Sequence, residues 1–255
     1  LTDAISEAFV QNENLGYDDG IKRVYGSVSL DFAYYNPYNL LTFITNHDME
    51  RPAIRFGTYK DSDETVLARM KNATTLLLTM RGVPQWYYGD EILMHGPEEM
   101  IGKGDAWWRT DFPGGWPGDK VNAFTSAGRT ALQNEMFDHT RTLMQWRKTS
   151  PAVTAGKLKH FMPFGDLVNT YVYFRYTPDF KDLVMVVINN GVEPVSLDWA
   201  HYAEIFDAAA EARAVAGTGA SSVTFTGCDI LTGATVSSST GSLTVPGMAS
   251  MVIQF

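Results

Sequence analysis

The sequence predicts an α/β part over residues 1–150, followed by an all-β part over residues 151–255. In the first part, two apolar runs flank a stretch with helical periodicity, which is the pattern of a strand–helix–strand (βα) repeat. In the second part, the hydrophobic pattern alternates, and short runs are separated by Gly, Asn, Asp and Pro. Such runs are typical of an antiparallel β-sandwich. We therefore place the boundary within residues 149–156.

Composition and charge narrow the class of protein. With 45% hydrophobic and 19% charged residues, the 255-residue chain is globular and long enough to bury a sizeable core. Its net charge of −9 gives no basic patch for phosphates, so nucleic acid is not expected as a partner. No apolar run approaches the roughly 18 residues of a membrane span. The single cysteine, Cys228, cannot form an internal disulfide, and we expect it to be a small buried hydrophobic residue.

The first element is an amphipathic helix over residues 1–10, with Leu1, Ile5, Ala8 and Phe9 on one face. The chain begins inside this helix and not with a methionine. Because a domain seldom begins inside an element, we expect the chain to be a piece of a longer polypeptide.

Residues 40–52 contain the candidate catalytic residues. Six residues that have the character of a buried strand are followed directly by a polar cluster that contains Asn46, His47, Asp48 and Arg51. Such a cluster is expected where a parallel sheet delivers catalytic side chains from its carboxyl edge. Neighbouring His and Asp residues also occur by chance in many loops, so the spacing alone leaves a structural role open.

A helix and a second strand follow. Asp61 with Glu64 three residues later fits a capping box, and apolar residues then recur at helical spacing, which predicts a helix over residues 62–80. The strand after it, in the sequence GVPQWYYGDE, ends in Asp90 and Glu91. We interpret these two acids as structural polar groups at the end of the strand.

FITNHD followed at this distance by GVPQWYYGDE resembles the alpha-amylase superfamily, glycoside hydrolase family 13, and within it the neopullulanase and cyclomaltodextrinase group. The two motifs are similar to the segments at the seventh and eighth strands of that family's barrel. The resemblance implies that residues 1–150 are the C-terminal part of a TIM (β/α)8 barrel and that residues 151–255 are the β domain behind it. It also implies a retaining hydrolase of alpha-glucosidic bonds that acts on an alpha-glucan. We predict no cofactor and no metal-binding residue in this chain, and calcium dependence stays open.

The resemblance assigns roles to two residues and shows that two catalytic groups of the family are not found in this sequence. A retaining glycosidase needs a carboxylate nucleophile and a carboxylic acid. In this family both follow earlier barrel strands, and neither segment occurs in this sequence. Asp48 matches the third family carboxylate, which contacts the sugar at the cleavage point, and His47 would bind a hydroxyl of the same sugar. The chain alone is therefore expected to be inactive and to self-associate through the open edge of its barrel.

Residues 92–125 have little periodicity and are rich in glycine, and loops of this length are usually functional. Three of the six tryptophans, Trp107, Trp108 and Trp116, fall within them. Indole rings stack on the apolar faces of pyranose rings, and guanidinium groups bind ring hydroxyls. Trp107, Trp108 and Arg109 are therefore candidate substrate-binding residues. Tryptophans that pin the loop to its own body would produce the same composition.

The remaining elements are a long helix over residues 126–148 and the strands of the second part. The strands are predicted at 168–176, 183–189, 192–197, 222–226, 243–245 and 248–255, with a short helix at 200–214. Two functions stay open: a fragment of an alpha-glucan hydrolase or transglycosylase, and a noncatalytic carbohydrate-binding or scaffold piece. The resemblance favours a periplasmic or extracellular location for the parent protein.

Overall fold

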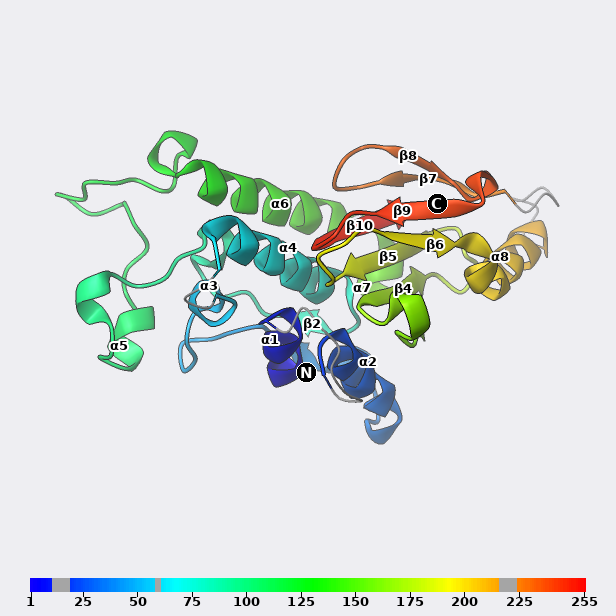
Figure 1. Cartoon of the computed structure of the whole chain (residues 1–255), viewed down its shortest axis with the longest axis horizontal. Coiled ribbons are helices and arrows are strands. Elements are labelled where there is room, and N and C mark those ends of the chain that lie inside the picture. Colours follow the sequence, from blue (N-terminus) through cyan, green and yellow to red (C-terminus); the bar gives the residue numbers. More distant parts are fainter. Residues whose placement is uncertain (11–18, 58–60, 216–223) are drawn as a thin grey trace.

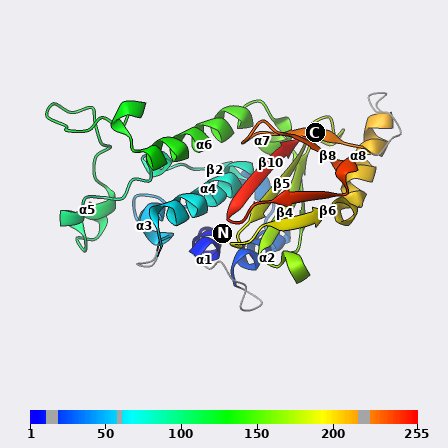
Figure 2. The same cartoon turned by 45° about the horizontal axis from the view of Figure 1, so that its top comes forward.

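A computed structural model describes residues 1–10, 19–57, 61–215 and 224–255. In Figures 1 and 2, α4 and α6 lie side by side next to a large C-terminal sheet, and α5 lies at the opposite end of the molecule. The helices are α1 (Thr2–Val10), α2 (Ile21–Ser29), α3 (Pro52–Arg55), α4 (Asp63–Thr79), α5 (Asp105–Trp108), α6 (Ala131–Arg147), α7 (Pro151–Ala155) and α8 (Ala203–Val215). Short 3₁₀ helices are Leu30–Ala33, Pro37–Asn39, Asp90–Ile92, Glu98–Met100, Ser126–Gly128, Gly165–Leu167, Trp199–Tyr202 and Ser238–Thr240. The strands are β1 (Leu41–Thr42), β2 (Val83–Pro84), β3 (Lys157–Phe161), β4 (Thr170–Tyr176), β5 (Leu183–Asn189), β6 (Val195–Asp198), β7 (Thr226–Asp229), β8 (Thr235–Ser237), β9 (Ser242–Val245) and β10 (Ala249–Gln254).

The two strands predicted for the first part pair in parallel, but they are much shorter than predicted. β1 and β2 align Leu41 with Val83 and Thr42 with Pro84. Pro84 has no N–H to donate, and no further strand flanks this pair within the described residues, so the ladder stops early. Leu41 and Val83 are consequently 58% and 52% exposed.

α4 confirms the predicted helix but begins at a different cap. Ser62 is the N-cap, and its hydroxyl accepts a hydrogen bond from the Thr65 N–H at 3.3 Å. The predicted capping box of Asp61 and Glu64 is wrong, because Asp61 lies one residue before the cap. Asp61 instead forms an ion pair with Arg69 at 2.7 Å.

α6 confirms the second long helix and begins later than predicted. Thr130 and Gln133 form a capping box, in which the Gln133 N–H donates to Thr130 Oγ1 at 3.2 Å and the Thr130 N–H donates to Gln133 Oε1 at 2.9 Å. The preceding residues 126–128 form a 3₁₀ turn. Helical periodicity therefore predicts the body of this helix well and its start poorly.

The C-terminal part contains an antiparallel sheet with the strand order β3-β4-β5-β10-β7-β8 and a separate antiparallel pair, β6-β9. The prediction of antiparallel strands is confirmed. One buried face of the large sheet shares a core with α4, and the other packs against β6, β9 and α8. The two faces alternate along β5, where Val184, Val186 and Ile188 belong to the first cluster and Leu183, Met185 and Val187 to the second.

Several predicted details differ in the structure. β3 and β8 were not predicted. Of the strand predicted at 222–226, residues 222 and 223 lie outside the described residues, Thr224 and Phe225 are in no strand, and Thr226 begins β7. The helix predicted at 200–214 is a 3₁₀ turn that continues into α8. Cys228 is exposed, so the prediction of a buried cysteine is wrong. On β7 the next residue, Asp229, points inward and is 1% exposed, which places Cys228 on the outer face.

The core is continuous across the predicted boundary. Arg175 of β4 is 1% exposed and donates hydrogen bonds to the carbonyl oxygens of Thr79 at 3.0 Å, Gly156 at 3.0 Å and Lys157 at 3.2 Å. Burial lowers the pKa of this guanidinium to about 10, and it therefore stays charged at neutral pH. Within the described residues, no helix has the length and apolar character needed to cross a membrane.

Candidate functional site

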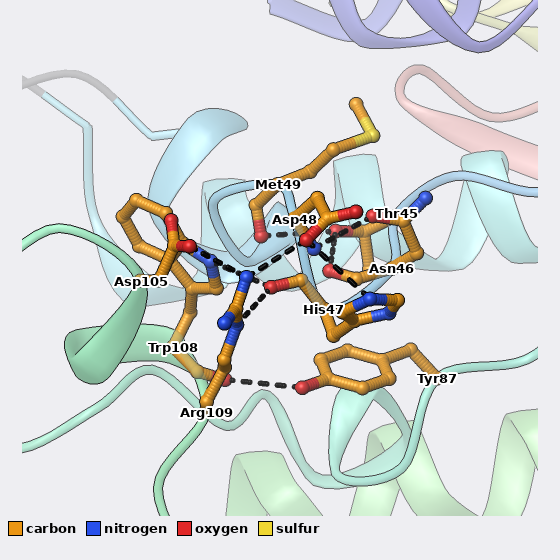
Figure 3. Close-up of polar contacts among 9 residues, drawn as sticks. All are labelled: Thr45, Asn46, His47, Asp48, Met49, Tyr87, Asp105, Trp108 and Arg109. Carbon is orange, nitrogen blue, oxygen red and sulfur yellow. Dashed lines mark hydrogen bonds and ion pairs between the residues drawn. The ribbon is translucent and has the colours of Figure 1, made fainter.

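The predicted polar cluster lies on a tight turn directly after β1. The Met49 N–H donates to the Asn46 carbonyl at 3.3 Å, and the Asp48 N–H donates to Asn46 Oδ1 at 2.8 Å. The hydroxyl of Thr45 donates to the carbonyl of Glu50 at 3.2 Å and so joins the two ends of the turn. These bonds hold the backbone while the side chains of His47 and Asp48 remain 65% and 64% exposed (Figure 3).

Arg109 and Asp48 are brought together although 61 residues separate them in the sequence. Arg109 donates from Nη2 to Asp48 Oδ1 at 2.7 Å and from Nε to the His47 carbonyl at 2.6 Å. The same Nη2 contacts Asp105 Oδ2 at 2.5 Å, and His47 Nε2 lies 3.4 Å from Asp48 Oδ1. All four side chains are at least 40% exposed, so a ligand could replace these contacts without a large change in packing.

Trp108 lies beside the same turn. Its indole N–H donates to the His47 carbonyl at 3.1 Å, so that Trp108 and Arg109 share one acceptor. The carbonyl of Trp108 accepts a hydrogen bond from the Tyr87 hydroxyl at 3.5 Å (Figure 3). It also accepts one from Arg51 Nε at 3.1 Å. α5 is thereby attached both to the turn after β1 and to the segment after β2.

Trp107 has different surroundings. It is half-buried and packs against Gly96, where an added Cβ would lie 1.8 Å from the Trp107 carbonyl oxygen. Its buried indole nitrogen has no hydrogen-bond partner among the described residues. The structure therefore brings His47, Asp48, Trp108 and Arg109 into one cluster and holds Trp107 against the loop.

Arg51 links the cluster to the protein interior, a role that the sequence did not reveal. Its side chain is fully buried and pairs with Asp90 at 3.2 Å. It also donates to the Tyr88 carbonyl and lies over the ring of Tyr87, 4.2 Å from the centroid. Burial raises the pKa of Asp90 to about 7, and the positive charge of Arg51 opposes that rise. The position of Arg51, three residues after Asp48, was its only signal in the sequence.

Glu91 also has a structural environment. Its carboxylate accepts hydrogen bonds from the indole of Trp86 at 2.9 Å and from the Gly89 N–H at 3.0 Å. This placement agrees with the interpretation of Asp90 and Glu91 as structural groups. Among the described residues, no group of three or more His, Cys, Asp or Glu side chains could hold a metal ion.

Two protein families match the sequence. Residues 23–173 match the family described as Alpha amylase, catalytic domain, and residues 158–224 match the one described as Cyclo-malto-dextrinase C-terminal domain. The chain is 30% identical over 161 residues to a cyclomaltodextrin glucanotransferase of Geobacillus stearothermophilus, covering 62% of this chain and 18% of that protein. It is 26% identical over 205 residues to alpha-amylase 3 of Dictyoglomus thermophilum, covering 74% of this chain and 37% of that protein.

The fold is similar to those of solved enzyme structures. The alpha-amylase GTA of Geobacillus thermoleovorans, complexed with acarbose, superimposes with a TM-score of 0.66 and 17% identity over 99% of this chain and 46% of its own. AmyP in complex with maltose gives a TM-score of 0.67 and 14% identity over 99% of this chain and 49% of its own. The chain thus spans less than half the length of these relatives.

Proposed function

Because this chain belongs to the alpha-amylase family, we propose that it is the C-terminal portion of a retaining alpha-glucan hydrolase or transglycosylase. In this proposal β1 and β2 are neighbouring strands of an incomplete (β/α)8 barrel. The observation that carries the proposal is the exposed pair His47 and Asp48 at the carboxyl end of β1, beside the segment that follows β2. Active sites of such barrels lie at the carboxyl ends of the strands.

Asp48 is proposed to accept hydrogen bonds from hydroxyls of the sugar at the cleavage point. These bonds strengthen as positive charge develops on the ring in the oxocarbenium-like transition state. His47, whose Nε2 lies 3.4 Å from Asp48 Oδ1, is placed to contact the same sugar. The pair would bind and distort the substrate, whereas the nucleophile and the acid/base would come from outside this chain.

Arg109 and Trp108 are proposed to complete the sugar site. In this structure Arg109 donates a hydrogen bond to Asp48 Oδ1. A sugar hydroxyl would either displace Arg109 from this oxygen or donate to it as a second partner. The Trp108 ring borders the turn through its bond to the His47 carbonyl. Trp107 belongs to the same proposed site, although its packing on Gly96 supports a smaller contribution to binding.

We also propose that the open sheet edge causes self-association of the isolated chain. Leu41 and Val83 project from β1 and β2 and are more than half exposed. A pocket of about 460 Å³ between the end of β2 and α6 is lined by Trp86, Phe137 and Met144, together with polar side chains such as Glu91 and Arg141. Exposed apolar surface next to an unpaired strand favours association with another chain.

The test of the proposed function is Asp48→Asn in the full-length parent. The substitution keeps the size of the side chain and removes its charge, so turnover of starch or pullulan should fall at least about 100-fold. KM should change far less, because the contacts matter most in the transition state.

Asp138→Asn, which alters an exposed aspartate on α6, is the matched control and should leave turnover unchanged. Turnover of Asp48→Asn within about tenfold of the wild-type value would contradict the assignment.

A further inference from the structure

A pocket of about 380 Å³ lies where α4 and α6 meet the start of β10. In Figures 1 and 2 the two helices lie side by side next to the sheet that contains β10. The turn between β7 and β8 completes the lining, and no residue of the proposed sugar site takes part in it. The polar side chains of the lining that bear on its function are those of Lys71, Asn72, Glu135, His139 and Ser250.

The hydrogen bonds of His139 fix the tautomer of its ring. Nε2 lies 3.1 Å from the Lys71 carbonyl oxygen and 3.1 Å from Thr75 Oγ1. A carbonyl oxygen can only accept, so Nε2 carries the proton and Nδ1 has a lone pair. Burial, aided by the charge of Lys71, lowers the pKa of His139 to about 4, so the ring is neutral near pH 7. Nδ1 has no hydrogen-bond partner within the described part of the chain.

A second acceptor among the lining residues also lacks a partner. Asn72 is 1% exposed, and its Nδ2 donates to the Asn189 carbonyl at 3.1 Å. Its Oδ1 is buried without a hydrogen-bond partner in the described residues. An unpaired buried acceptor destabilises a fold unless a bound molecule supplies a donor. The pocket therefore offers two acceptors, His139 Nδ1 and Asn72 Oδ1, to such a molecule.

One side of the pocket is built by a strained turn. Met248, which lines the pocket just before β10, has a φ of +48°, a left-handed conformation that is rare for such a side chain. Its N–H donates to the Gly191 carbonyl at 2.7 Å. A Cβ on Gly247 would lie 1.9 Å from the Val192 carbonyl oxygen, so the turn is tightly packed. Strained backbone of this kind is concentrated at binding and catalytic sites.

The charges around the pocket favour an uncharged ligand. Lys71 of α4 and Glu135 of α6 form an ion pair, so each already has a counter-charge. The low pKa of His139 shows that positive charge is unfavourable beside its ring. Glu64, the remaining charged residue of the lining, disfavours an anion. A neutral molecule with several O–H donors meets these conditions, and Leu67 offers its carbon skeleton an apolar contact.

We propose that this pocket binds a small neutral polyol, about the size of a six-carbon sugar alcohol, whose hydroxyls donate to His139 Nδ1 and Asn72 Oδ1. A hydroxyl suits the site because it can donate to one group and accept from another. Ser250 Oγ, which pairs with Thr75 Oγ1 at 2.8 Å, offers such a further partner. The inference goes beyond the proposed function, because it assigns a separate site and a different ligand.

The first experiment follows the His139 ring by NMR in the ¹⁵N-labelled 255-residue chain. Millimolar sorbitol should move the Nδ1 resonance upfield, as expected for a lone pair that accepts a hydrogen bond, and should leave Nε2 nearly unchanged. A separate titration with glucose distinguishes a cyclic from an open-chain polyol, and a shift with either one supports the inference. 1-Hexanol is the control ligand, because its single hydroxyl cannot satisfy two acceptors.

The second experiment measures sorbitol affinity by calorimetry in three variants. Ala68→Leu enlarges a side chain of the lining without altering these hydrogen bonds, and it should weaken binding at least about tenfold. His139→Phe removes the Nδ1 acceptor and should weaken binding by a similar factor. His201→Phe replaces an exposed histidine outside the pocket and should leave the affinity unchanged.

The inference is overturned if Nδ1 does not shift with either polyol, which would mean that water alone satisfies the acceptors. An equal shift with 1-hexanol, or an unchanged sorbitol affinity in Ala68→Leu, also overturns it. Ala68→Leu keeps the test decisive even if His139→Phe fails to fold. These outcomes are independent of the proposed function, which depends on the turnover of Asp48→Asn in the parent.

Discussion

At the residue scale, exposure and burial divide the polar side chains near β1 into two kinds. His47 and Asp48 are solvent-accessible and held by their backbone, so they are free to exchange partners. Arg51 and Asp90 are buried and form an ion pair, which joins the segments that carry the exposed pair and the end of β2. Arg51 lies only three positions after Asp48 in the sequence, but their environments give them opposite chemical behaviour.

Arg51→Met tests the buried pair. Removal of the guanidinium takes away the charge that opposes the raised pKa of Asp90 and the donor to the Tyr88 carbonyl, and we expect a loss of about 3–5 kcal/mol in the free energy of unfolding. A second substitution, Asp90→Asn, in the Arg51→Met background should restore part of that loss above pH 7, because it removes a buried carboxyl that must otherwise bind a proton. Chemical denaturation of the single and double variants measures both effects.

Arg141→Met is the control for this measurement. Arg141 is 53% exposed and pairs with Asp138 on the surface of α6, so its loss should cost about 0.5 kcal/mol or less. Equal losses for Arg51→Met and Arg141→Met would show that Arg51 does not organise the site.

At the element scale, the contact between α4 and α6 contains a pH-sensitive group. His139 of α6 lies against α4, with Nε2 3.1 Å from both the Lys71 carbonyl and Thr75 Oγ1. Burial, aided by the charge of Lys71, lowers the pKa of His139 to about 4. As the pH falls, His139 therefore binds a proton near pH 6.5 in the unfolded chain but only near pH 4 in the folded chain.

His139→Gln should reduce the dependence of the unfolding free energy on pH below about pH 6.5. As the pH falls from about 6.5 to 4, the wild type should lose about 3 kcal/mol of unfolding free energy relative to the variant, whereas the difference should be constant above pH 7. Denaturant titrations of both proteins across this range give that difference directly. A difference that does not change with pH would contradict the assignment.

The sequence predicted elements better than their ends or contacts. Periodicity identified α4, α6 and β5, because each buries a regular stripe or a continuous apolar run. Periodicity overestimated the length of β1, because the length of a strand depends on its partner strands as well as on its own residues. It could not place Arg109 against Asp48, because a contact across 61 residues through an irregular loop leaves no local pattern.

At the scale of the whole molecule, the parallel pair β1-β2 leads to a prediction about the behaviour of the isolated chain. We expect the 255-residue chain to release no reducing sugar from starch or pullulan, because a closed barrel of this type requires eight strands and a complete pair of catalytic carboxylates. We also expect light scattering to report oligomers. Addition of a family barrel portion that supplies the other strands and both catalytic carboxylates should give some hydrolysis if the two parts dock.

The control for that assay is the Asp48→Asn chain, which excludes a contaminating amylase. Hydrolysis by the wild-type chain that disappears in Asp48→Asn would show that a complete active site exists within these residues. Such a result would overturn the proposal that the nucleophile and acid/base lie outside them.

The two buried faces of β5 have a consequence for recombination between relatives. Its alternate side chains belong to two different clusters, one of which includes α4. A chimera that exchanged only residues 151–255 would combine the sheet of one parent with α4 of another. The side chains between the sheet and α4 would then no longer pack closely. Productive crossovers should therefore fall before α4, so that the helix and the sheet are inherited together.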